Sequence, residues 1–159
     1  MFGFVTANDA EKVIENWDEI KRQEKNEATI SESIQKVPKA FPANIRAEKV
    51  QKKAAKVGFD FAHYDQALDK VYEELEELKE ALKIGDINQI NDEFGDLMFS
   101  IINLSRFLHL NAENSLTNAT DKFINRFVDV ELIALREGKH LSEMSIDELD
   151  VLWGRVKNH

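Results

Sequence analysis

The chain contains no cysteine, only two prolines and six glycines, and no long apolar run. The absence of cysteine excludes disulfide bonds and thiolate metal sites. Few prolines and glycines argue against an architecture of many turns and strands. No apolar segment approaches the roughly 20 residues of a membrane-spanning helix. The first residues lack the basic stretch of a secretory signal peptide, so we expect a cytoplasmic protein.

The charges are mostly negative and are unevenly distributed. The formal net charge is −9, which argues against general binding to nucleic acid. The charged residues between positions 35 and 57 are mostly basic, whereas those between positions 64 and 96 are mostly acidic. Two interpretations are open. The two segments neutralise one another, or the basic segment faces phosphates while the acidic segment holds a metal ion.

The spacing of the apolar residues predicts helices nearly throughout the chain and no strand. We expect an all-α helical bundle of about five to six helices. The predicted helices are residues 7–27, 43–57, 64–84, 87–108 and 112–136, and a short last helix from residue 145. Residues 31–42 contain both prolines and are predicted to be a connector. The expected division is an N-terminal helix and connector, residues 1–42, followed by a domain of residues 43–159.

Two pairs of acidic residues carry the most chemical information. Glu74 and Glu77 are three residues apart, and so are Glu93 and Asp96. Each pair therefore lies on one face of its helix, with Cβ atoms roughly 5–6 Å apart. Four carboxylates on two facing helices offer the oxygen ligands that Mg²⁺ and Mn²⁺ prefer, and such ions usually act on phosphates. The histidines are scattered, which disfavours iron and zinc sites.

Each acidic pair also has a simpler interpretation. If Leu75 marks the centre of the buried face of its helix, Glu74 lies about 100° away, at the flank of the core. Acidic runs on helices usually face solvent. Glu93 falls inside an apolar stripe that includes Phe94 and Ile101, where a carboxylate is costly unless it is paired or bound to metal. Alternatively, the second pair occupies an exposed first turn and interacts favourably with the helix dipole.

These acids resemble the signature of the MazG family of nucleoside triphosphate pyrophosphohydrolases, all-α enzymes of the dimeric dUTPase-like superfamily. The signature is Glu-Glu-x-x-Glu, a variable spacer, and Glu-x-x-Asp, which correspond here to residues 73–77 and 93–96. Further similar segments are residues 45–61, 95–99, 103–106 and 122–127. The similarity covers roughly residues 15–157. The chain resembles the C-terminal MazG domain of two-domain members.

The resemblance implies a reaction and a set of site residues. The reaction is hydrolysis of a nucleoside triphosphate to a monophosphate and pyrophosphate, which serves house-cleaning or control of the nucleotide pool. The implied cofactor is Mg²⁺, with Mn²⁺ as an alternative, and the implied assembly is a homodimer or higher homo-oligomer. The family's metal ligands map onto Glu74, Glu77, Glu93 and Asp96. Its nucleotide contacts map onto Lys70, Lys122, Arg126 and Trp153.

The catalytic carboxylate and the function class are left open at this point. Glu73 or Glu77 is expected to orient or deprotonate the attacking water. Asn125 stands where the family has the first arginine of a pair, which puts one phosphate contact in doubt. Thr120 stands where asparagine is usual, which puts polar positioning near Lys122 in doubt. The alternatives to an enzyme are a nucleotide-binding regulator with weak or lost catalysis and a non-catalytic helical oligomerisation module.

Overall fold

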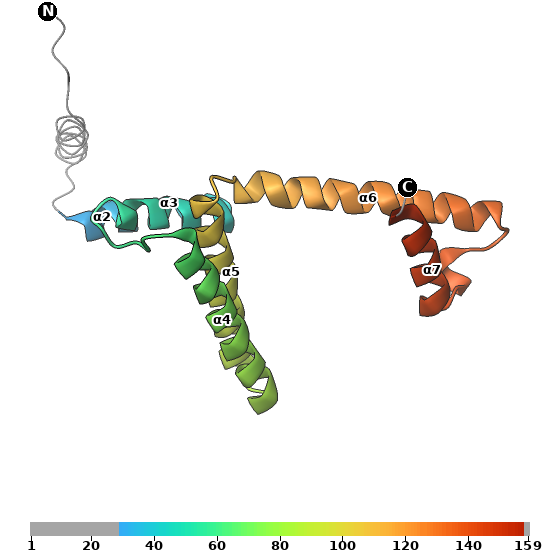
Figure 1. Ribbon diagram of the computed structural model, residues 1–159, viewed down its shortest axis with the longest axis horizontal. Coiled ribbons are helices and arrows are strands. Elements are labelled where there is room, and N and C mark those ends of the chain that lie inside the picture. Colours follow the sequence, from blue (N-terminus) through green and yellow to red (C-terminus); the bar gives the residue numbers. More distant parts are fainter. Residues whose placement is uncertain (1–28, 158–159) are drawn as a thin grey trace, which may run out of the picture. The chain divides into compact units, whose positions relative to one another are not determined.

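The computed structural model describes residues 29–157, and these residues form helices joined by short loops (Figure 1). The helices are α2 (Ile30–Gln35), α3 (Ala43–Ala55), α4 (Tyr64–Ile84), α5 (Ile87–Phe107), α6 (Ala112–Arg136), the 3₁₀ helix η1 (Leu141–Glu143) and α7 (Ile146–Lys157). The prediction of an all-α fold is confirmed for this part of the chain. The helix predicted at residues 7–27 lies outside the described residues.

The long helices begin and end close to the predicted residues, and capping residues mark these ends. Gly85 ends α4 in the left-handed conformation, with φ 82°, which glycine adopts without a steric cost. The side chain of Asp86 then accepts a hydrogen bond from the backbone N–H of Asn88 at the start of α5. Asn111 caps α6 by accepting from the N–H of Asn114 at 2.8 Å.

One predicted connector is partly helical. Residues 31–42 were expected to be irregular, but α2 occupies most of the first half of this segment. Thr29 caps α2, because its hydroxyl accepts from the N–H of Glu32 at 3.2 Å, and α2 packs against α3. The prolines at positions 38 and 42 come after the helix and therefore did not prevent it.

The helices form two compact units, one that ends at Leu110 and one that begins at Asn111. In the first unit α4 and α5 pack along each other, and α3 packs on α5 (Figure 1). The division expected at residue 42 stays a prediction. Among the described residues, no helix is long and apolar enough to cross a membrane.

The buried face of α4 differs from the predicted one. The buried residues of α4 are Ala67, Glu74 and Ala81, which recur every seven residues and therefore share one face. The predicted centre, Leu75, is only partly buried, so the true face is rotated by about 100° from the expected one. The two alanines are small and allow α5 to approach closely. Glu74 consequently lies at the middle of this face rather than at its flank.

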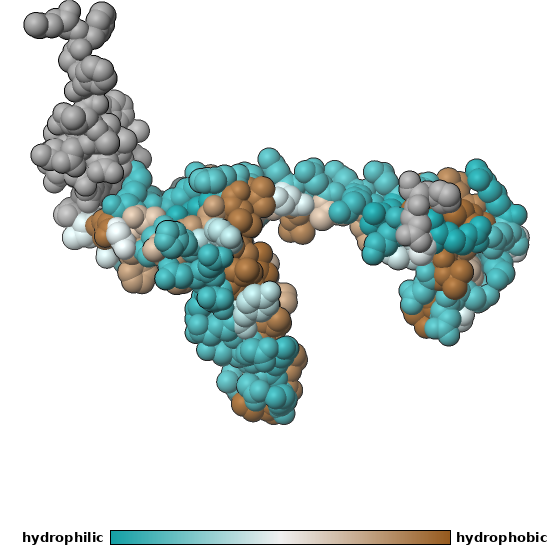
Figure 2. Space-filling view, in the orientation of Figure 1, coloured by the Kyte–Doolittle hydropathy of each residue, from teal (hydrophilic) through white to brown (hydrophobic). Residues whose placement is uncertain are grey.

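The apolar stripe predicted for α5 is only partly covered. Phe94 is 52% exposed, Ile101 48% and Leu108 44%, whereas the buried residues of α5 are Ser100 and Ile102. The reason is that α3 and α4 cover only part of this helix within its unit. Figure 2 shows the resulting apolar surface on the α4–α5 pair.

The second unit consists of α6, η1 and α7. Its core contains Val130, Ala134 and Leu152, with Trp153 packed against them. The turn into α7 is a capping box. The N–H of Ser145 donates to Oε2 of Glu148 at 3.0 Å, and the N–H of Glu148 donates to the hydroxyl of Ser145 at 3.3 Å.

Glu148 should give the second unit a stability that depends on pH. Its hydrogen bonds with Lys139 and then with Ser145 lower the pKa of its carboxyl group from 4.5 to about 2. Because the pKa is lower in the folded state, the ionised carboxylate stabilises the fold fully at pH values above its unfolded pKa of 4.5. This stabilisation is lost as the pH falls from 4.5 towards about 2. Glu148→Gln should therefore lower the free energy of unfolding at neutral pH, and the difference from the unsubstituted protein should shrink in acid.

Urea unfolding of both proteins at several pH values, followed by helical circular dichroism, measures this difference. Glu143→Gln is a matched control from the neighbouring 3₁₀ helix. A difference that stays constant from neutral pH down to the acid limit would show that Glu148 acts through shape and not through its charge.

Candidate functional site

Three carboxylates from two helices converge in the first unit. Glu74 and Glu77 come from α4, and Glu93 comes from α5. Each offers an oxygen atom, and these three oxygen atoms all lie within 4.8 Å of one another. Glu74 is buried, Glu93 is half-buried and Glu77 is exposed. We call these three residues the acidic cluster.

The burial of Glu74 is the most unusual feature of the acidic cluster. Its side chain is 7% exposed, and one oxygen, Oε1, lies 2.8 Å from Nζ of Lys70. The other oxygen, Oε2, is buried and has no hydrogen-bond partner among the described residues. Burying a carboxylate oxygen without a donor is costly. An oxygen in this state is suited to bind a cation.

The electrostatics of the acidic cluster also favour a cation. Desolvation raises the pKa of the Glu77 carboxyl group above its usual value, and the negative charge of Glu74 raises it further. The charge of Glu93 acts in the same direction, while that of Lys70 opposes it. The three carboxylates therefore repel one another, and a bound divalent cation would remove this repulsion.

Lys70 lies at the edge of the acidic cluster. Its Nζ is 2.7 Å from Oε1 of Glu73 and 2.8 Å from Oε1 of Glu74. Hydrogen bonds to these two carboxylates, that to Glu73 first, raise the pKa of the lysine, so it is fully charged near neutral pH. The predicted nucleotide contact Lys70 and the predicted catalytic residue Glu73 are thus both adjacent to the predicted metal ligands.

Asp96 is not one of the three residues whose oxygens converge. It is exposed on α5, one turn after Glu93, and its role as a metal ligand stays a prediction. Gly95, between the two acids, has no atom within 4 Å of the position that a Cβ would take. Among the described residues, nothing therefore requires glycine there for close packing.

The remaining predicted contacts belong to the second unit. Lys122 is exposed and Arg126 is half-buried on α6, four residues apart and hence on one face. The Trp153 ring lies 5.2 Å from the Phe123 ring, measured between centroids, and packs against the unit's core. The predicted contacts of these three residues with nucleotide stay predictions.

A polar network in the first unit was not predicted. Arg106 near the end of α5 forms an ion pair with Asp60 in the loop before α4, and both side chains are largely buried. The sequence offered one signal, since both residues lie in segments that resemble the MazG family. Their separation along the chain hid the contact, because sequence spacing predicts neighbours only within a helix or strand.

The residues present fit a hard divalent cation. Such ions take carboxylate oxygens as ligands, and the acidic cluster supplies three, including the unpartnered Oε2 of Glu74. No histidine or cysteine belongs to the acidic cluster, which disfavours a zinc centre. The arrangement can therefore hold a divalent ion against an anionic ligand such as a polyphosphate.

Comparison with known proteins agrees with this geometry. Residues 63–130 match the family model of the MazG nucleotide pyrophosphohydrolase domain. The chain is 41% identical over 141 residues to a Thermotoga maritima protein named nucleoside triphosphate pyrophosphohydrolase/pyrophosphatase MazG, an alignment that covers 89% of the chain and 54% of that protein. It is 33% identical over 159 residues to the Escherichia coli nucleoside triphosphate pyrophosphohydrolase, covering 99% of the chain and 60% of the relative.

A third relative is the uncharacterised protein YabN of Bacillus subtilis, 39% identical over 158 residues, or 99% of the chain and 32% of that protein. The chain thus spans between 32% and 60% of the length of these relatives. The resemblance read from the sequence is confirmed. Residues 63–130 thus match the MazG nucleotide pyrophosphohydrolase domain, and this segment includes the acidic cluster.

Proposed function

We propose that the protein hydrolyses nucleoside triphosphates to nucleoside monophosphates and pyrophosphate, as the names of two relatives suggest. The observation that carries the proposal is the acidic cluster, with its buried, unpartnered carboxylate oxygen, inside the segment that matches the family. A carboxylate set without histidine suits magnesium, which is the usual partner of nucleoside triphosphates. House-cleaning or control of the nucleotide pool is the corresponding role.

Glu74, Glu77 and Glu93 would hold the ion, with Asp96 as a further ligand. When bound, Mg²⁺ or Mn²⁺ supplies positive charge to the triphosphate oxygens and lowers the pKa of a bound water. The protein's own residues do the rest. Glu73 or Glu77 orients or deprotonates the attacking water, because a carboxylate within hydrogen-bonding reach acts as a general base.

The cationic residues are assigned to the triphosphate. Lys70 is charged and lies beside Glu73 and Glu74, so it can neutralise a phosphate next to the ion. Lys122 and Arg126 share one face of α6 and would stabilise the charge on the departing pyrophosphate. Trp153 is half-buried, and its ring would stack on the base.

Pyrophosphate release from a panel of ribo- and deoxyribonucleoside triphosphates tests the proposal. The full chain with Mg²⁺ should release pyrophosphate, and chromatography should show the monophosphate as the other product. Release of inorganic phosphate and a nucleoside diphosphate would contradict the proposal, because it would show that a different phosphoanhydride bond is cleaved. Tight binding without products would support a regulator, and neither binding nor products would support a helical oligomerisation module.

The proposed partner is a second copy of the chain. Each unit leaves large apolar side chains exposed, including Phe94 and Met98 on α5, and Phe127 and Leu132 on α6. Monomeric proteins rarely expose large contiguous apolar patches. Light scattering during size-exclusion chromatography measures the molar mass, and a monomer at micromolar concentration would contradict the proposed self-association. The cytoplasmic location stays a prediction.

A further inference from the structure

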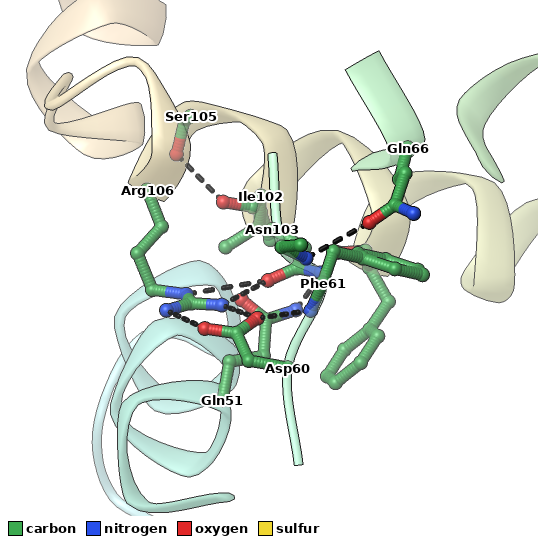
Figure 3. Close-up of polar contacts among 10 residues, drawn as sticks. Gln51, Asp60, Phe61, Gln66, Ile102, Asn103, Ser105 and Arg106 are labelled. Atoms are coloured by element: carbon green, nitrogen blue, oxygen red, sulfur yellow. Dashed lines mark hydrogen bonds and ion pairs between the residues drawn. The ribbon is translucent and has the colours of Figure 1, made fainter. Parts of the chain in front are cut away.

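The loop before α4 is fastened to the end of α5 by a polar network (Figure 3). Arg106 donates from Nη1 to Oδ2 of Asp60 at 2.8 Å and from Nη2 to Oδ1 of the same carboxylate. Arg106 also donates from Nε and Nη2 to Oδ1 of Asn103, at 3.2 and 2.9 Å. The side chains of Arg106 and Asp60 are only 14% and 22% exposed. A two-bonded, partly buried pair of this kind is stronger and more directional than an exposed ion pair.

Neighbouring contacts also hold this loop in place. The N–H of Phe61 donates to Oδ1 of Asp60 at 3.0 Å, and the N–H of Ala62 donates to Oε1 of Gln66 in the first turn of α4 at 2.8 Å. The rings of Phe61 and Phe107 lie 6.4 Å apart between centroids. The loop is therefore connected both to α5 and to the start of α4.

The network lies at the end of the α4–α5 pair that is remote from the connecting turn. Gly85 and Asp86 link the two helices directly at one end. At the other end α4 begins at Tyr64 and α5 ends at Phe107, and no short connection exists there. Without the network, the first turns of α4 would be held to α5 by packing alone, and α4 would be freer to rotate.

The acidic cluster lies between these two ends. Glu74 is near the middle of α4, and Glu93 lies within α5. One residue corresponds to about 100° around a helix, so a modest rotation of α4 carries Glu74 and Glu77 away from Glu93. Repulsion among the three carboxylates favours such a rotation. The restraint at the remote end opposes it.

We propose that the Asp60–Arg106 ion pair positions the acidic cluster. It fixes the orientation of α4 about its own axis, so that Glu74 and Glu77 face Glu93. The affinity of the cluster for a divalent cation then depends on this remote pair. Asn103 orients the guanidinium group, and a lysine at position 106 could not reproduce the planar two-bonded contact. The inference rests on the proposed function only in assigning a divalent cation to the acidic cluster.

Calorimetric titration of the full chain with Mn²⁺, in the absence of nucleotide, tests the proposal. The variants are Asp60→Asn, Arg106→Lys and the double variant Asp60→Asn/Arg106→Lys. Arg155→Gln is the matched control, because it breaks the pair of Arg155 with Glu137 in the other unit. Each positioning variant should bind Mn²⁺ about 10-fold more weakly, the loss typical of groups that orient metal ligands. The double variant should lose little more than either single variant, and Arg155→Gln should match the unsubstituted protein.

Thermal unfolding of each variant without metal shows which ones are folded at the titration temperature, and only these are compared. A folded Asp60→Asn protein that binds Mn²⁺ as tightly as the unsubstituted protein would overturn the positioning role, and so would an equal loss in Arg155→Gln. If the unsubstituted protein itself binds no Mn²⁺, the metal assignment of the proposed function fails instead. If Asp60→Asn unfolds at the titration temperature, the more conservative Arg106→Lys decides between these outcomes.

Discussion

Glu93→Gln should strongly reduce pyrophosphate release and leave the fold at least as stable as before. The substitution removes one of three carboxylates whose oxygens lie within 4.8 Å of one another. A glutamine keeps the size of the side chain and removes its charge, so repulsion with Glu74 and Glu77 falls. Turnover and stability are therefore expected to change in opposite directions. Substitution of a residue that served only the fold would lower both turnover and stability.

The expected loss in kcat/KM is on the order of 100-fold or more, which corresponds to about 2.7 kcal/mol of transition-state stabilisation. Pyrophosphate release measures kcat/KM, and urea unfolding without metal measures the free energy of unfolding. Glu76→Gln is the matched control, because Glu76 lies on α4 outside the acidic cluster and pairs with Lys79 on the surface. Turnover of Glu93→Gln at the unsubstituted rate would remove Glu93 from the site.

Removal of divalent cations should also abolish activity, reversibly. The acidic cluster without a cation repels a triphosphate, so EDTA should reduce pyrophosphate release to background. Excess Mg²⁺ or Mn²⁺ should restore it, whereas Ca²⁺ should restore less, because Ca²⁺ takes more ligands in a looser geometry than Mg²⁺. The assay is the same pyrophosphate measurement after passage through a chelating resin.

The same ions should raise the thermal stability of the first unit in the absence of nucleotide. A ligand at 100 times its dissociation constant stabilises the folded state by about 2.7 kcal/mol. Na⁺ at equal ionic strength is the control, since it screens charges without occupying the site. Equal stabilisation by Na⁺ and Mg²⁺ would indicate general screening, and undiminished activity in EDTA would contradict a metal-dependent reaction.

Local sequence signals predicted the helices well. Tyr64–Ile84 and Ala112–Arg136 have the predicted bounds, and α5 ends one residue earlier than expected. Glycine in the left-handed conformation at position 85 and the side-chain caps Asp86 and Asn111 set these ends. Such signals act over a few residues, so they can be read from the chain directly. The short helix α2 was missed because it carries few apolar residues and lies next to prolines.

The burial predictions were less accurate, and the reason is physical. Periodicity identifies an apolar face, but it does not identify the part of that face that a neighbouring helix covers. A leucine marked the expected centre of α4, yet the buried residues are Ala67, Glu74 and Ala81. This places Glu74 under the neighbouring helix. Several apolar residues of α5 remain exposed, because the other helices of the first unit cover only part of α5.

The sequence by itself therefore determined the all-α class, most helix ends and the acidic residues that carry the chemistry, because these depend on neighbours along the chain. Only the tertiary structure showed that oxygen atoms of Glu74, Glu77 and Glu93 lie within 4.8 Å of one another, and that Asp60 meets Arg106. It also showed that one oxygen of Glu74 is buried with no donor among the described residues. These features depend on the rotation and separation of two packed helices. The size and shape of the side chains between the helices set that geometry, and no short-range pattern in the sequence encodes it.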